Sequence, residues 1–213
     1  MSNHTAKRKR VRFAPLVLAT SVAAAALLSV SMSGTLSGFV ASITNTNNTA
    51  ASGSLVMEEK STGTTPVTCL STDGGSVSTN TATCSTINKF GGSTTMVPGT
   101  PVSTTISIRN TGTLNASTFT LTPGTTCTQT AIATPSGTAT DLCAKMALVV
   151  KQDGAQVYSG TLTAFAGSAA KSLTTVAAGG SSTFTFAVTL DSAATNAYQG
   201  LQASVPMTWT FNS

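Results

Sequence analysis

The chain has 213 residues, of which only 8% are charged, and its formal net charge of +5 comes from a basic cluster at its start: Lys7, Arg8, Lys9, Arg10 and Arg12. After Gly38, six lysines or arginines balance six acidic residues. A neutral, charge-poor chain lacks the basic surface that nucleic-acid binding requires, which excludes that class of partner, and it lacks the self-repulsion that keeps copies of a protein apart.

An export signal is predicted for residues 1–38. The basic cluster is followed by an apolar run, residues 13–30, and then by mostly small residues, 31–38. This order of charged, apolar and small residues is typical of a secretory signal peptide. The alternative is a permanent membrane anchor, because the run is almost long enough to cross a bilayer. We therefore predict a secreted protein that contacts a membrane only through an uncleaved leader.

The mature chain is predicted to start with a mixed segment and one strand. Residues 39–52 read FVASITNTNNTAAS, which is apolar at first and then polar. Residues 54–59 (SLVMEE) predict a strand, and we expect the acidic pair Glu58 and Glu59 at its end to be solvated. Residues 61–92 are rich in Thr, Ser and Gly, which indicates loops with one or two short strands.

The chain has four cysteines: Cys69 and Cys84 in the polar stretch 61–92, Cys127 in a second polar loop, residues 124–141, and Cys143 just after it. An exported chain with an even number of cysteines usually oxidises them. Three pairings are possible, and the spacing favours sequence neighbours, each pair closing a loop of about 16 residues worth roughly 3 kcal/mol. Zinc is not expected, because there is no C-x-x-C pair and the only histidine, His4, lies in the signal. We expect no cofactor.

Strands are also predicted in the middle of the chain. Apolar and polar residues alternate in residues 102–109 (VSTTISIR), and Phe119 and Leu121 alternate with threonines in residues 118–122. This period of two is typical of a strand with one buried face. Asn110-Thr-Gly-Thr between them predicts a turn.

The next part of the chain is more ambiguous. Residues 142–151 fit either a helix or a strand, but the Asp153-Gly154 turn that follows favours a β-hairpin. A short helix is predicted near residues 165–171 and one helical turn within residues 191–196.

The last third carries the clearest alternation. Two strands are predicted, with these residues facing the core: Phe184, Phe186, Val188, Leu190, Val205, Met207, Trp209 and Phe211. Pro206 lacks a backbone donor, so the last strand is expected to be an edge strand or bulged there. Many short strands without βα alternation predict one all-β domain, residues 53–213: an antiparallel β-sandwich of jelly-roll type with at most one or two short helices.

Three blocks of the sequence resemble the TasA/camelysin family. Residues 39–59 have an aromatic start, a polar segment and then an S-G-x-L-x-φ strand at residues 52–57, where φ is apolar. Residues 98–114 contain a P-G turn, a strand and an N-T-G turn. Residues 196–200 (NAYQG), followed by the strand of Trp209, resemble the family's N-x-[YF]-Q-G ending. The three blocks span nearly the whole mature chain.

The resemblance implies a jelly-roll domain that a dedicated signal peptidase trims just before Phe39 and that assembles with copies of itself, head to tail, into extracellular fibres of a biofilm matrix. Thr35-x-Ser37 offers an alternative cleavage site. In such fibres the N-terminal segment of one subunit completes the sheet of the next. The four cysteines and the insertion at residues 61–92 depart from the family's simpler pattern.

The segment that would act as the donor strand is short: Phe39, Val40, Ala41, Ser42 and Ile43. When it is extended, Phe39, Ala41 and Ile43 lie on one face, so they can fill an apolar groove while the backbone pairs with a sheet edge. Residues 44–52 would then link subunits. The alternative is that this segment is the first strand of its own domain or a frayed terminus.

No enzymatic activity is expected. The chain beyond the signal has no histidine, which removes the zinc ligands of H-E-x-x-H peptidases and the base of a Ser–His or Cys–His pair. Besides a fibre subunit, the sequence leaves open a monomeric surface adhesin or carbohydrate-binding sandwich and, less favoured, a secreted peptidase.

Overall fold

The computed structural model describes residues 43, 49–74 and 79–213. The chain divides between Ala50 and Ala51 into two units, and the fold below is that of Ala51–Ser213. The predicted export signal lies outside the described residues.

The described residues form eleven strands, two short α-helices and one 3-10 turn. In chain order they are β1 Met57–Ser61, β2 Thr68–Leu70, β3 Pro101–Asn110, β4 Thr118–Pro123, β5 Thr128–Ala131, α2 Leu142–Lys145, β6 Met146–Gln152, β7 Ala155–Thr161, α3 Leu162–Phe165, β8 Lys171–Ser172, β9 Ser181–Leu190, η2 Asn196–Tyr198, β10 Leu201–Ser204 and β11 Met207–Asn212.

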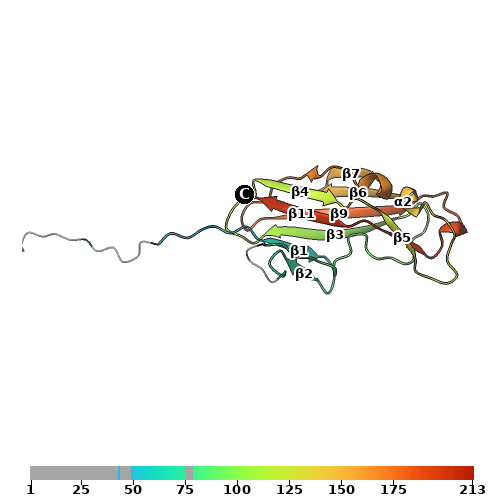
Figure 1. Cartoon of the computed structure of the whole chain (residues 1–213), viewed down its shortest axis with the longest axis horizontal. Helices are drawn as coiled ribbons and strands as arrows, with labels where there is room; N and C mark the ends of the chain where they lie inside the picture. Colours follow the sequence, from blue (N-terminus) through green and yellow to red (C-terminus); the bar gives the residue numbers. More distant parts are fainter. Residues whose placement is uncertain (1–42, 44–48, 75–78) are drawn as a thin grey trace, which may run out of the picture. The chain divides into compact units, whose positions relative to one another are not determined.

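All strand pairs are antiparallel. A six-stranded sheet has the order β2-β1-β3-β9-β6-β7, a three-stranded sheet has the order β11-β4-β8, and β10 pairs with β5. In Figure 1, β4 and β11 overlie the middle of the larger sheet, whereas β1 and β2 extend beyond them. The predicted all-β, antiparallel sandwich with short helices is confirmed, and the jelly-roll connectivity stays a prediction.

Aromatic side chains join the two layers. Phe184 and Phe186 of β9 are fully buried. The rings of Phe119 and Phe184 meet edge to face with centroids 5.7 Å apart, and Trp209 of β11 packs 4.6 Å from Phe184. The alternation along β9 thus places every second side chain in the core, because successive side chains in a strand point to opposite faces.

Several predicted boundaries are wrong. The helix expected near residues 165–171 lies at Leu162–Phe165, where the Thr161 hydroxyl accepts from the Ala164 N–H at 3.1 Å and so caps it. The helical turn expected within residues 191–196 lies at Asn196–Tyr198. Residues 142–151 are helix first and then strand.

The first predicted strand is also displaced. Residues 54–56 are not in a ladder, although the Ser54 and Val56 carbonyls accept from the Thr113 and Thr111 N–H groups at 2.8 and 2.9 Å. The regular strand starts only at Met57.

The predicted turn after β3 is held by a buried amide. Asn110 is completely buried; its Nδ2 donates to the Leu114 carbonyl at 2.7 Å and the Val176 carbonyl at 3.3 Å, and its Oδ1 accepts from the Gly112 N–H at 3.0 Å. This one side chain therefore satisfies three backbone groups.

We expect Asn110→Ala to lower the free energy of unfolding by about 3 kcal/mol, because buried groups that lose their hydrogen-bond partner cost about 1–3 kcal/mol each. Urea denaturation monitored by circular dichroism measures this change. A loss below about 1 kcal/mol would show that water replaces the amide and that the turn does not depend on it.

Candidate functional site

The sandwich has an unpaired edge along β11. The Pro206 carbonyl accepts from the Gly124 N–H at 2.7 Å, and the Asn212 carbonyl accepts from the Ser117 N–H at 2.7 Å, so the even-numbered backbone groups of β11 face β4. Because backbone groups of successive residues in a strand point to alternate sides, those of the odd-numbered residues point away from β4. No strand lies on that side of β11 in the described sheets.

The same edge continues along β10. The Gly200 carbonyl accepts from the Ile132 N–H at 2.8 Å, which again turns even-numbered groups toward the partner strand and odd-numbered groups outward. Within the described residues, no hydrogen bond reaches the outward groups of Leu201, Ala203, Met207, Trp209 and Phe211. The eleven residues from Leu201 to Phe211 give an edge of about 36 Å at a strand rise of about 3.3 Å per residue.

A groove of about 1180 Å³ runs beside this edge. β10 and β11 form one side, β1 and the segment 79–98 form the other, and side chains of β6 and β9 contribute to its lining. Much of the lining is apolar and comes from Met57, Ile87, Met96, Val188, Trp209 and Phe211. An unpaired strand edge thus lies next to a groove whose apolar side chains are partly or fully buried.

The core-facing residues predicted from the sequence divide into two groups. Phe184, Phe186, Val188, Leu190 and Val205 are buried. The three on β11, Met207, Trp209 and Phe211, pack against the core but are only half-buried. They remain partly exposed because no strand flanks β11. Pro206 interrupts the last predicted strand between β10 and β11, at an edge as expected.

Trp209 links the groove to the core. Its ring packs against Phe119, Phe184 and Phe186. Its indole Nε1 is buried and has no acceptor among the described residues. A buried donor without an acceptor costs about 1–3 kcal/mol.

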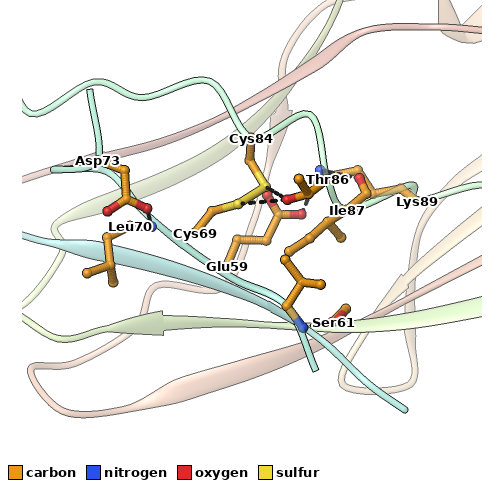
Figure 2. The surroundings of a disulfide bond; sticks show 10 residues. Glu59, Ser61, Cys69, Leu70, Asp73, Cys84, Thr86, Ile87 and Lys89 are labelled. Carbon is orange, nitrogen blue, oxygen red and sulfur yellow. Dashed lines mark hydrogen bonds and ion pairs between the residues drawn. A yellow bond between two sulfur atoms is a disulfide. The ribbon is translucent and has the colours of Figure 1, made fainter. Parts of the chain in front are cut away.

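The opposite side of the groove carries a disulfide. Cys69 of β2 is bonded to Cys84, and the Thr86 hydroxyl lies 3.6 and 3.7 Å from the two sulfur atoms (Figure 2). Ile87 follows and is buried in the core. Residues 61–92 were predicted as loops with one or two short strands, and β2 is such a strand.

The expectation that Glu59 is solvated is wrong. Glu59 is only 7% exposed, and Lys89 Nζ lies 2.6 Å from its Oε1. Among the described residues, that oxygen accepts no hydrogen bond of good geometry, so the ion pair with Lys89 is what offsets the cost of burying its charge. This pair could not be predicted, because the two residues are distant in the chain and lie in segments without clear periodicity.

Charged groups are also paired near η2. Lys145 Nζ donates to Asp191 Oδ2 at 3.2 Å, which raises the pKa of Lys145. The Ala193 N–H and then Lys145 lower the pKa of Asp191. Tyr198, which lines the groove, donates to Asp141 at 2.8 Å, and this bond raises the pKa of Tyr198. Lys145 and Asp191 thus form an ion pair near the groove, and the Tyr198 hydroxyl ties the groove lining to Asp141.

The predicted donor residues are mostly not placed. Phe39, Val40, Ala41 and Ser42 lie outside the described residues, and Ile43 is 98% exposed.

The second disulfide joins Cys127, after β4, to Cys143 in α2. Both disulfides have the pairing that the spacing favours, and together they indicate an oxidising, extracellular environment. In the part of the chain that the structure describes, no group of three or more His, Cys, Asp or Glu residues could hold a metal ion. No helix among residues 43, 49–74 and 79–213 is long and apolar enough to cross a membrane.

Neither a protein-family model nor a curated protein sequence matches this chain. The TasA/camelysin resemblance therefore stays a prediction based on the three sequence blocks.

Proposed function

We propose that this protein is a non-enzymatic subunit of an extracellular fibre, of the biofilm-matrix type that the resemblance implies. Residues 39–43 of one copy would occupy the groove of the next and pair with β10 and β11. The observation that carries this proposal is the unpaired edge from Leu201 to Phe211 next to an apolar groove.

The donor segment matches the groove in chemistry. An added strand satisfies the outward backbone groups of the edge, and its alternate side chains enter the groove. Burying Phe39 and Ile43 would contribute roughly 1.5–3 kcal/mol each. The segment has no charged residue, as suits a groove whose buried charges, Glu59 and Lys89, are already paired.

The edge is long enough for the donor. Residues 39–43 span about 17 Å when extended, which is about half of the edge of about 36 Å. The donor and the groove are different surfaces of the same chain, so the contact is heterologous and each added subunit brings a new groove. A filament follows, with the chain itself as the main partner and signal peptidase as the enzyme that frees Phe39.

Electron microscopy of the exported, leader-cleaved protein tests this proposal. Wild-type protein should form thin filaments, and deletion of residues 39–47 should leave folded monomers. Filaments from the deleted protein would rule out the donor role. Deleted monomers that retain binding to a carbohydrate, together with a wild type that never polymerises, would favour the adhesin alternative.

The only tryptophan of the chain provides a spectroscopic test. Trp209 is half-buried beside the groove, so a donor strand should remove its remaining contact with water. We expect its fluorescence maximum to shift to shorter wavelength in step with filament growth. An unchanged maximum in assembled protein would place the subunit contact elsewhere.

A further inference from the structure

The side of the groove opposite β11 is a loop without regular structure. None of residues 79–98 belongs to a helix or strand, yet many of them line the groove. The shape of this side therefore depends on individual contacts between the loop and the sandwich rather than on a hydrogen-bonded ladder.

Four residues of the loop are its main anchors, and Phe90 and Met96 also pack against the core. Asn80 donates to the Leu55 carbonyl and accepts from the Ser71 hydroxyl, and Cys84 is bonded to Cys69. The other two anchors are the buried side chain of Ile87 and the ion pair of Lys89 with Glu59.

Two of these anchors meet at one point of the larger sheet. Glu59 of β1 and Cys69 of β2 are register partners, so the disulfide and the ion pair attach the loop to adjacent residues (Figure 2). β2 is only three residues long and is the edge strand of its sheet. Such a short edge strand contributes little by itself, so the disulfide also holds β2 against β1.

We propose that the Cys69–Cys84 disulfide fixes the segment 79–98 as a wall of the groove and is thereby a determinant of assembly. This inference rests on the proposed function and identifies the residues that shape its acceptor site. Without the bridge, the wall has fewer anchors and samples conformations that do not fit a donor strand. The apparent affinity for the donor then falls in proportion to the fraction of competent molecules.

The second disulfide provides a matched control. The two bridges have sequence separations of 15 and 16 residues, so their effects on the entropy of the unfolded chain are nearly equal. Cys127 and Cys143 do not line the groove. A difference in assembly between the two bridge variants therefore measures the effect of fixing the segment 79–98 and not a difference in general stability.

The test compares exported full-length C69S/C84S and C127S/C143S proteins with the wild type by sedimentation and electron microscopy, and measures the melting temperature of each. We expect similar losses of melting temperature. C69S/C84S should need at least about a tenfold higher concentration to form filaments, corresponding to a competent fraction of about one tenth, while C127S/C143S should stay within about twofold of the wild type.

Unchanged assembly of C69S/C84S, or equal losses in both variants, would overturn the inference alone. A wild type that stays monomeric would overturn the proposed function and this inference with it. If circular dichroism shows that C69S/C84S is unfolded, the assembly of E59Q/K89Q tests the inference instead. This variant removes the ion pair without leaving a lone charge and keeps both disulfides. Weaker assembly of this variant supports the wall, and unchanged assembly overturns it.

Discussion

Replacing Ala203 by proline is expected to abolish polymerisation while the domain stays folded. The Ala203 N–H points away from β5, so its loss removes no bond of the β5–β10 ladder. A donor strand needs that N–H, and the proline ring occupies the space where the donor backbone would lie. The effect on assembly is therefore large and the effect on folding small.

A proline on β7, an edge strand of the larger sheet, is the matched control. The Asp153 N–H donates to the Thr183 carbonyl and the Asp191 N–H donates to the Lys145 carbonyl, both at 2.8 Å. The backbone N–H and C=O groups of odd-numbered residues in β6 therefore face β9, and those of even-numbered residues face β7. Ser159 of β7 is the register partner of an odd-numbered residue of β6. Its backbone groups therefore point away from β6, toward the outer side of β7, and its side chain is exposed.

Ser159→Pro thus removes an outward N–H from an edge that the proposal does not use. We expect S159P to form filaments like the wild type and A203P to remain monomeric, with melting temperatures close to that of the wild type in both. Sedimentation velocity and electron microscopy measure the difference. Filaments of A203P would show that β10 and β11 are not the acceptor edge.

The strands of this fold could be predicted wherever local alternation and burial agree. In β9 every second side chain is buried over ten residues, and in β3 over the last five, so there the pattern in the sequence is the pattern of burial. The turn at Asp153-Gly154 could also be predicted from its sequence. In the structure both residues have positive φ, 46° and 87°, as a type I′ hairpin requires.

The groove could not be predicted from the same pattern. Met207, Trp209 and Phe211 alternate as clearly as the residues of β9, but alternation shows which face is apolar and not whether a strand lies alongside. The anchors Ile87 and Lys89 were missed for another reason. They lie in a Thr- and Ser-rich loop, and only the folding of the chain brings them to the core and to Glu59.

Replacing Ile43 by aspartate should also abolish polymerisation, but from the donor side. An unpaired carboxylate in the apolar groove costs at least about 3 kcal/mol, which weakens the contact more than about a hundredfold. The fold should be unaffected, because Ile43 is 98% exposed in the single chain. Unchanged melting together with loss of filaments is the expected result, and filaments of I43D would show that this side chain does not enter the groove.

Mixing the two variants separates a head-to-tail contact from other modes of association. I43D keeps an intact groove and A203P keeps an intact donor, so one A203P chain can occupy the groove of one I43D chain. Growth then stops, because the open groove carries the proline and the remaining donor carries the aspartate. Sedimentation should therefore show heterodimers and no longer species. A symmetric contact between identical surfaces would let neither variant restore the other, so an absence of heterodimers would rule out the proposed polymer.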